Sequence, residues 1–246
     1  MPIYSYSQLS MLGGIGKVAS ILLSKSKYLN GLQCPKYLWL LFNEPERIPA
    51  VDAATQYRFD QGHLVSELAK RLFPGGIDIP NENFAANLRQ TWELLEGRTP
   101  LFEAGIGTGR IYARADILNP AGKDEWDIIE VKSSTSVKDE HIDDVSFQKF
   151  CYEKAGLKIR RSFLAHINNE YVRDGDIDLE QLFSVEDISS QVEEASLGIQ
   201  DRIEAMLDII SAEHCPNTTI GNHCKAPYDC PLQKMCWGLL PENSVF

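Results

Sequence analysis

The chain has 246 residues, of which 43% are hydrophobic and 24% are charged, the composition of an ordinary globular protein. No window approaches the roughly eighteen uncharged apolar residues that a membrane helix needs, and the N-terminal segment lacks the basic and apolar regions of a signal peptide. We therefore expect a cytoplasmic protein with no membrane partner. The formal net charge of -11 disfavours a broad nucleic-acid-coating surface, but not a nuclease, whose acidic residues hold cations and whose DNA meets a local patch.

The first third of the chain is expected to be helical after an unpatterned start. Residues 1–22 are expected to form an N-terminal extension, and their GGIGKV stretch is not a phosphate-binding loop because Met11 stands where that motif needs its first glycine. Residues 23–43 place apolar side chains at helical spacing and predict one helix. Residues 51–73 and 83–96 predict two more helices, the first of which ends at FPGG.

The rest of the chain alternates strands and helices. The segments PLFEAGI, GRIYARADIL and WDIIEVKSS predict three strands, with NPAGKDE as the turn between the second and the third. A helix over about 143–155 and a strand IRRSFLAHI follow. Residues 187–211 predict one long amphipathic helix, with an inner stripe of Val192, Ala195, Ile203, Met206 and Ile210. This order of elements indicates an α/β protein with helical additions.

Three charged residues on the second and third predicted strands suit metal-dependent hydrolysis of a phosphodiester. Asp116 lies near the end of one strand and Glu130 on the next, and strands joined by so short a turn pair as a hairpin about 4.8 Å apart. Glu130 and Lys132 are two residues apart and project to the same face, with Val131 turned into the core. Two such carboxylates can hold Mg²⁺ or Mn²⁺, and the ammonium group can offset charge developing on a phosphate.

An acidic residue two positions before a lysine is common by chance, and a surface ion pair on an edge strand explains most such triplets. The flanking segments add to the signal. Gln148 and Tyr152 are four residues apart and share one face of a predicted helix, and His63 lies on an earlier helix, one turn before Glu67. Glu67 and Glu103 are additional acidic groups to which we assign no role.

Six cysteines in a chain of this kind favour metal ligands or buried thiols over disulfides. Three of them, Cys224, Cys230 and Cys236, follow one another at steps of six residues, whereas iron–sulfur and structural zinc sites usually have four ligands. The residues leave four candidates for the missing ligand: Cys34, Cys151, Cys215 and His223. Cys151 lies inside a predicted helix, where a buried thiol is the favoured role.

The order of these motifs resembles one branch of a known superfamily. A glycine–histidine helix, an aspartate strand, a Glu-Val-Lys strand and a Gln-x-x-x-Tyr helix resemble the RecB-like PD-(D/E)XK nucleases. One cysteine before this core and three after it resemble the iron–sulfur subgroup, which includes the CRISPR-adaptation exonucleases and the AddB helicase–nuclease subunit. The stretches AHINNEYVRDGDIDLEQLF and HCKAPYDCP also resemble a related bacterial family of uncharacterised proteins. The resemblance runs from Leu23 to Trp237.

The resemblance implies a restriction-endonuclease-like mixed sheet flanked by helices, with a helical iron–sulfur region that joins the N- and C-terminal segments. It implies an N-terminal helix with the first cluster cysteine over 23–50, a nuclease core over 51–185, and a C-terminal helix with the cysteine cluster over 186–246. It further implies metal ligation by His63, Asp116, Glu130 and the Val131 carbonyl, catalysis by Lys132, and positioning of the scissile strand by Gln148 and Tyr152.

The implied cofactors are Mg²⁺ or Mn²⁺ at the nuclease site and a [4Fe–4S] cluster on Cys34, Cys224, Cys230 and Cys236. The implied activity is metal-dependent cleavage of DNA, with an exonuclease acting on single strands or DNA ends favoured. The implied partners are DNA and other DNA-processing proteins or a further domain in a longer chain. The relatives often carry a Cys-x-x-Cys pair that this chain replaces with two five-residue gaps. Those gaps also disfavour zinc, whose structural sites usually include a tight pair.

Two alternatives of another class remain open at this point. One is a catalytically idle DNA-binding or interaction module on the same fold, and the other is a zinc-binding scaffold without an active site.

A cluster of basic residues also has two interpretations, because it is either a track for DNA phosphates or a solvated edge. Its members are Lys154, Lys158, Arg160 and Arg161.

Overall fold

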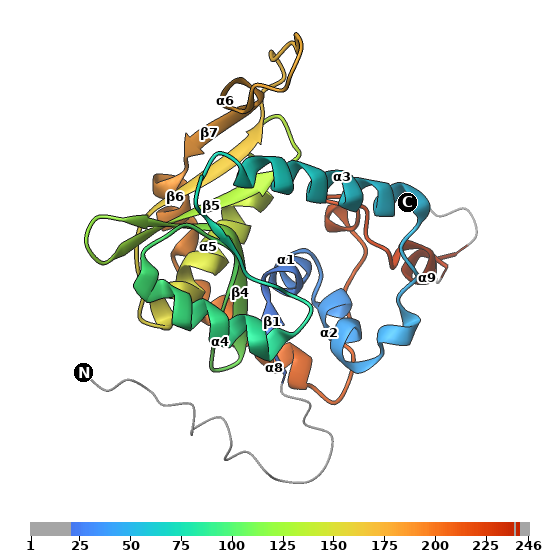
Figure 1. The fold of residues 1–246 in the computed structure, drawn as a ribbon. Coiled ribbons are helices and arrows are strands. Elements are labelled where there is room, and N and C mark those ends of the chain that lie inside the picture. The colour runs from blue at the N-terminus through green and yellow to red at the C-terminus, as the bar shows by residue number, and fades with distance from the viewer. Residues whose placement is uncertain (1–20, 239, 242–246) are drawn as a thin grey trace.

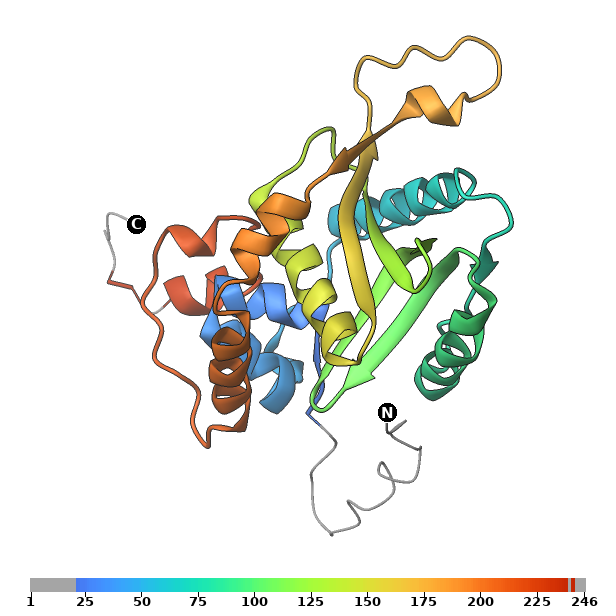
Figure 2. The same ribbon diagram turned by 90° about the vertical axis from the view of Figure 1, so that its left-hand side faces the viewer.

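One mixed β-sheet forms the centre of the protein (Figures 1 and 2). The computed structural model describes residues 21–238, 240 and 241, and within them seven strands form this sheet in the order β2-β3-β4-β5-β6-β7, with β1 added against β4. The pairs β3–β4, β4–β5 and β6–β7 are antiparallel, whereas β1–β4, β2–β3 and β5–β6 are parallel. The strands are β1 (Leu23–Ser24), β2 (Ile77–Asp78), β3 (Leu101–Thr108), β4 (Ile111–Ala121), β5 (Glu125–Lys132), β6 (Lys158–Ile167) and β7 (Phe183–Asp187).

Helices cover both faces of the sheet, which confirms the predicted α/β class with a mixed sheet flanked by helices. In Figure 2, α3 and α4 lie on one side of the sheet, and α5 lies on the other with α1, α2, α7 and α8 outside it. The helices are α1 (Lys25–Gln33), α2 (Pro35–Asn43), α3 (Ala53–Lys70), α4 (Phe84–Leu94), α5 (Asp139–Lys154), α6 (Leu179–Leu182), α7 (Ser189–Ser196), α8 (Ile199–Ser211) and α9 (Gln233–Trp237). Short 3₁₀ turns occupy Pro45–Arg47, Leu95–Gly97 and Asn222–Cys224.

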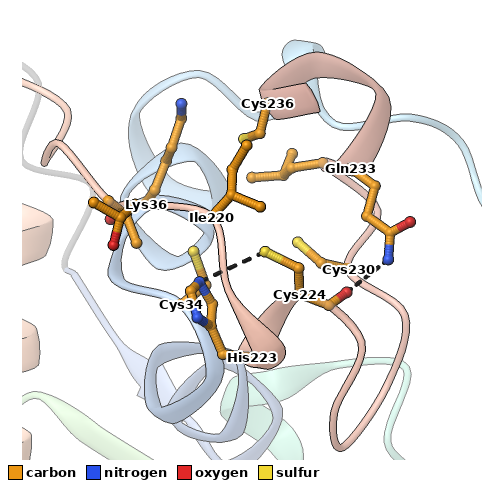
Figure 3. Close-up of a pocket in the computed structure, with 11 residues that line it drawn as sticks. Cys34, Lys36, Ile220, His223, Cys224, Cys230, Gln233 and Cys236 are labelled. Carbon is orange, nitrogen blue, oxygen red and sulfur yellow. Dashed lines mark hydrogen bonds between the residues drawn. The ribbon is translucent and has the colours of Figure 1, made fainter. Parts of the chain in front are cut away.

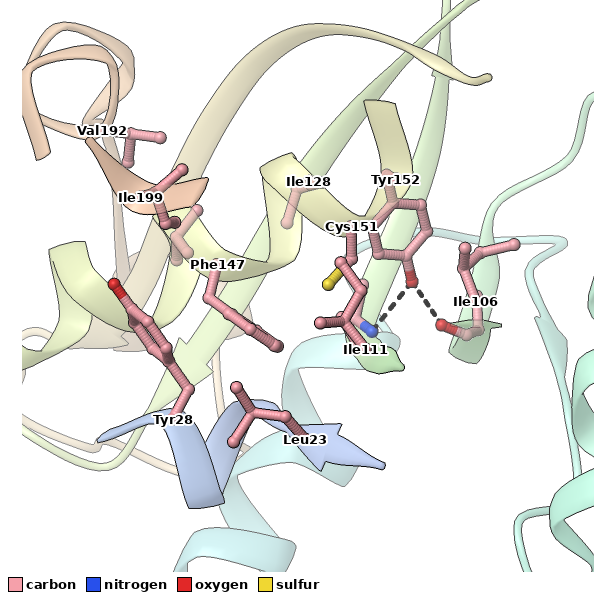
Figure 4. Packing of buried hydrophobic residues seen from close by; sticks show 14 of the residues in the cluster. Leu23, Tyr28, Ile106, Ile111, Ile128, Phe147, Cys151, Tyr152, Val192 and Ile199 are labelled. Carbon is pink, nitrogen blue, oxygen red and sulfur yellow. Dashed lines mark hydrogen bonds between the residues drawn. The ribbon is translucent and has the colours of Figure 1, made fainter. Parts of the chain in front are cut away.

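The larger part of the core lies on the α5 face of the sheet (Figure 4). Tyr28 of α1 stacks on Phe147 of α5 with ring centroids 4.7 Å apart, and both side chains are fully buried. The predicted apolar stripe of the C-terminal helix packs into this cluster, with Val192, Ile203, Met206 and Ile210 buried. A smaller cluster on the other face places Ala69 of α3 against Ile129 and Val131 of β5.

Two predicted helices are each broken into two. The helix expected over 23–43 is interrupted at Cys34, which is extended (φ −156°, ψ 114°) because Pro35 has no N–H and disfavours helical geometry in the residue before it. The helix expected over 187–211 breaks between α7 and α8 at Gly198, whose φ of +69° lies in the left-handed region. The first break places the buried Cys34 at a corner between two helices.

The two ends of the described chain meet beside the sheet. The indole of Trp39 in α2 donates to the carbonyl of Ala212 after α8 at 2.9 Å, and Asn43 donates to the carbonyl of Ile210 at 3.0 Å. The N-terminal and C-terminal segments therefore form one helical region, as the sequence predicts. Residues 1–20 of the expected N-terminal extension lie outside the described residues. None of the helices in the described part has the length and apolar character to cross a membrane.

Candidate active site

Glu130 and Lys132 project together from β5 towards α5. Strand alternation turns Ile129 and Val131 to the α3 face, so Glu130 and Lys132 lie on the opposite face, beneath α5. Glu130 is only 1% exposed. Its Oε1 accepts from Lys132 Nζ at 2.6 Å, and its Oε2 accepts from Gln148 Nε2 of α5 at 2.7 Å. The predicted Glu-x-Lys pair and the glutamine of the later helix thus form one hydrogen-bonded group.

Asp116 lies across the hairpin from Glu130. The β4–β5 register pairs Ile117 with Ile129, so the next position along β4 brings Asp116 opposite Glu130. The Asp116 Oδ2 accepts from the Val131 amide at 2.8 Å, which fixes the carboxylate to β5. The two predicted acidic residues therefore face each other from neighbouring strands.

Two further charged residues complete the site. Asp144 of α5 is 2% exposed, and its Oδ2 lies 2.6 Å from Lys132 Nζ while its Oδ1 accepts from Gln148 at 2.9 Å. Lys25, the first residue of α1, donates to both oxygens of Glu130 at 2.8 and 3.0 Å. The sequence carries a signal for Asp144, which precedes Gln148 by one helical turn, but none for Lys25, which meets Glu130 across 105 residues of chain.

The charges of this group depend on one another. Burial opposes the positive charge of Lys25 and Lys132, but the carboxylates of Asp144, Glu130 and Asp116 outweigh it and raise the pKa of both lysines. Burial also opposes ionisation of Asp144, yet the two ammonium groups hold the pKa of this carboxyl well below its usual range. Buried ionic groups of this kind add little net stability and concentrate at functional sites.

Tyr152 lies inside the core. Its hydroxyl donates to the carbonyl of Ala104 on β3 and accepts from the amide of Ala115 on β4 at 3.0 Å (Figure 4). These two alanines are partners in the β3–β4 register, so the hydroxyl is inserted between two strands beside Asp116. At the neighbouring position of β3, Glu103 has a φ of +56°, a strained value for a residue other than glycine. Tyr152 is fully buried and holds the sheet rather than facing a DNA strand.

The predicted ligand His63 and the acidic residues Glu67 and Glu103 make no hydrogen bond or ion pair with this group among the described residues. His63 is an exposed residue of α3, the helix that packs on β5. Glu67 pairs with Lys70 at 2.5 Å, and Glu103 pairs with Arg114 at 2.8 Å. Over the part of the chain that the structure describes, no three His, Cys, Asp or Glu side chains are grouped so as to hold a metal ion. The structure thus brings Asp116 and Glu130 together but does not add His63 to them.

The basic cluster lies at the opposite end of the strands from the site. Lys158 is in register with Glu125 at the start of β5, whereas Glu130 and Lys132 lie near its end. Lys158 pairs with Asp124, Arg160 with the buried Asp127, and Arg161 with Asp187. These three positive charges are neutralised by carboxylates, which favours the solvated edge over a phosphate track.

Four cysteines line one cavity between the N- and C-terminal segments (Figure 3). Cys34 comes from the corner between α1 and α2, and Cys224, Cys230 and Cys236 come from the C-terminal loop and α9. Cys34, Cys224 and Cys230 are buried and Cys236 is partly exposed. Cys215 and Cys151 do not line this cavity, and Cys151 is buried in the core beside α5.

Hydrogen bonds between the two segments, and within the C-terminal loop, hold the chain around these cysteines. Gln33, the last residue of α1, donates to the carbonyls of His223 and Tyr228 at 2.8 and 2.6 Å. The Cys230 amide donates to the Cys224 carbonyl at 2.9 Å and closes the loop between them. Burial raises the pKa of the Cys34 thiol and raises that of Cys230 to about 11, so these thiols stay protonated until a metal displaces the proton.

Comparison with known proteins yields distant structural likenesses. No family model matches the sequence, and no curated protein matches it. The structure is similar to LHK-Exo in complex with dAMP, at 12% identity and a TM-score of 0.40, over 77% of this chain and 90% of that one. It is also similar to the LHK-Exo alkaline exonuclease from Laribacter hongkongensis, at 13% identity and a TM-score of 0.34, over 77% of this chain and 90% of that one. A third similar structure is SSO0001, at 14% identity and a TM-score of 0.37, over 96% of this chain and 92% of that one. Likenesses at this level carry no argument about activity, and none identifies the iron–sulfur branch.

Proposed function

We propose that this protein is a metal-dependent DNA nuclease. The observation that carries the proposal is the buried Glu130 carboxylate, which faces Asp116 across the β4–β5 hairpin and binds Lys132 on the same strand face. Hard carboxylate oxygens on adjacent strands are the ligands that Mg²⁺ and Mn²⁺ prefer. A surface ion pair on an edge strand does not describe this group, because β5 is central in the sheet and Glu130 is buried.

Asp116, Glu130 and the Val131 carbonyl would hold the ion. His63 is proposed as a further ligand on the order of the motifs alone, since its helix, α3, packs on the face of β5 opposite to Glu130. A bound divalent ion would supply an activated water and stabilise the leaving oxygen of the phosphodiester. Lys132 would offset the negative charge that develops on the phosphate, while Asp144 and Gln148 keep its ammonium and the Glu130 carboxylate in place.

We further propose that Cys34, Cys224, Cys230 and Cys236 bind a structural [4Fe–4S] cluster. Support comes from the donor set, since four unpaired thiols from both ends of the chain line one cavity. A single zinc ion needs its sulfur ligands about 2.3 Å from one centre. The two five-residue gaps between the last three cysteines disfavour zinc, whose structural sites usually include a tight Cys-x₂₋₄-Cys pair. The favoured substrate is a single DNA strand or a DNA end, as the motif order implies.

The first test is cleavage of labelled single-stranded and double-stranded DNA in Mn²⁺ by protein purified without oxygen. Asp116→Ala combined with Lys132→Ala should lower the rate by at least about 10²-fold, since each removes a preorganised electrostatic partner. Asp124→Ala is the matched control, because this exposed hairpin carboxylate pairs, within the part of the chain that the structure describes, with Lys158 alone. Parental cleavage by the double variant would assign the activity to another site or a contaminant.

The same preparation separates the alternatives. A catalytically idle module would bind DNA without cutting it at any concentration of Mg²⁺ or Mn²⁺. A zinc scaffold would be colourless, whereas a [4Fe–4S] protein absorbs visible light and contains iron and sulfide. Iron analysis and an absorbance spectrum, taken before any assay of activity, decide between zinc and an iron–sulfur cluster at the cysteines.

A further inference from the structure

Lys25 is the residue of the site that no sequence motif indicates. Its Nζ lies 2.8 and 3.0 Å from the two oxygens of Glu130 and 3.7 Å from Asp144 Oδ1. With Lys132 it completes a group of two carboxylates and two ammonium ions. The side chains of Lys25 and Lys132 are 25% and 26% exposed, where those of Glu130 and Asp144 are almost fully buried. The group is therefore open to solvent at its two lysines.

The Glu130 carboxylate has no oxygen without a donor. Oε1 accepts from Lys25 and Lys132, and Oε2 accepts from Lys25 and Gln148. A divalent ion that binds Glu130 must displace one of these donors. Lys132 keeps a 2.6 Å contact with Asp144, and Gln148 keeps one of 2.9 Å. Among the described residues, Lys25 keeps the 3.7 Å contact with Asp144 alone. Lys25 is the donor with the least to hold it in place.

The charge balance gives Lys25 a second effect. Lys25 and Lys132 balance Glu130 and Asp144, so Asp116 leaves the group with a single net negative charge. A divalent ion converts this into a single net positive charge, which attracts a phosphodiester. Without Lys25 the group would be doubly negative, would bind the ion more tightly, and would be neutral once loaded.

We propose that Lys25 occupies the cation position on Glu130 in the metal-free protein and moves onto the DNA phosphate once the divalent ion is bound. The inference rests on the proposed nuclease function and assigns a second lysine to that site. Its four-carbon stem begins at the first turn of α1, and its side chain is partly exposed, so the ammonium can leave Glu130 without unfolding the helix.

The test is direct titration of Mn²⁺ into full-length protein purified with its cysteine-bound metal, followed by electron paramagnetic resonance of the free ion. Lys25→Gln should bind Mn²⁺ about tenfold more tightly than the parent, because a unit positive charge leaves the cation position. At saturating Mn²⁺, DNA cleavage by the same variant should fall by about 10²-fold, because the phosphate loses a partner. Lys25→Arg should stay close to the parent in Mn²⁺ affinity.

Lys27→Gln is the matched control, since Lys27 lies on the same helix with its ammonium 4.0 Å from the Phe42 ring centroid and no carboxylate partner within the described residues. Lys25→Met, which keeps the apolar stem, replaces Lys25→Gln if the latter unfolds. Equal or weaker Mn²⁺ affinity in a folded Lys25 variant, with a parent that binds Mn²⁺ and cuts DNA, would overturn this inference alone. A parent that binds no Mn²⁺ would overturn the proposed function itself.

Discussion

The Tyr152 hydroxyl accepts a hydrogen bond from the Ala115 amide at 3.0 Å and so takes the place of a strand-to-strand bond beside Asp116. The same hydroxyl donates to Ala104 on the other strand. A side chain from α5 thereby fixes the separation of β3 and β4 next to Asp116, the acidic residue that β4 contributes to the site. The helix that carries Gln148 is therefore also the element that shapes the strand carrying Asp116.

Tyr152→Phe removes both hydrogen bonds without opening a cavity. We expect a loss of about 1–3 kcal/mol in the free energy of unfolding, because the buried Ala115 amide is left without its acceptor. Cleavage of DNA should fall as well, since Asp116 is the next residue along β4. Denaturant unfolding and kcat/KM measure the two effects.

Tyr171→Phe is the control for this change. The Tyr171 hydroxyl accepts from the Asp178 amide at 3.0 Å in an exposed loop, so its loss should leave stability and cleavage near the parental values. Cleavage by Tyr152→Phe at the parental rate, despite the loss of stability, would show that the inserted hydroxyl does not position Asp116.

Asp144 is expected to act on Lys132 rather than on the metal. Asp144→Asn keeps the size of the side chain and its contact with Gln148 but removes the charge that pairs with Lys132 at 2.6 Å. We expect the turnover rate to fall by at least about tenfold, and the Mn²⁺ affinity to fall less than in Asp116→Asn, because Asp144 contributes charge to the group but no ligand to the ion. Asp116→Asn, in contrast, should lower the Mn²⁺ affinity. A large loss of Mn²⁺ binding in Asp144→Asn would instead make Asp144 a metal ligand.

The elements around the site were predictable because their signals are local. β4 alternates buried and partly exposed residues up to Ile117, and Glu130 and Lys132 follow the two-residue period of a strand. Gln148 lies in the following helix. The break at Cys34 has a local signal as well, because a proline follows it. The apolar periodicity continues on both sides of that proline, so the sequence predicts one helix.

The contacts that complete the site were not predictable from the sequence. Lys25 reaches Glu130 only because β1 pairs with β4 and delivers the start of α1 to the sheet, and a two-residue strand leaves no period to recognise. Tyr152 is likewise four residues from Gln148, a spacing that gives both the same helix face but not the depth at which each lies. Depth depends on packing between elements distant in the chain.

The contact of α1 with α8 depends on a glycine. A Cβ atom added at Gly31 would lie 2.7 Å from the Met206 sulfur and 2.9 Å from a Leu38 methyl carbon, both at the ends of flexible side chains that must shift. Overpacking of about 1–3 kcal/mol, less about 0.5–1 kcal/mol from helix propensity, leaves Gly31→Ala destabilising. Gly62→Ala on α3 meets no atom within 4 Å and should stabilise the protein by about 0.5–1 kcal/mol through helix propensity. Denaturant unfolding should therefore give changes of opposite sign in the free energy of unfolding for the two variants. An unchanged free energy of unfolding in Gly31→Ala would contradict the close contact.

Cys34 is expected to join the two ends of the chain through the cysteine-bound cluster. It lies at the end of α1 and lines the same cavity as Cys224, Cys230 and Cys236, so a cluster on these residues closes a loop of about 190 residues. A crosslink of that span stabilises by roughly 5 kcal/mol in the chain-entropy model. Cys34→Ala should therefore lose the visible absorbance and lower the melting temperature.

Cys151→Ala and Cys215→Ala are the controls, because their side chains do not line the cavity, and both variants should keep the visible absorbance. Iron retained in Cys34→Ala and lost in Cys215→Ala would make Cys215 the fourth ligand, and iron and sulfide analysis of the three variants distinguishes these results.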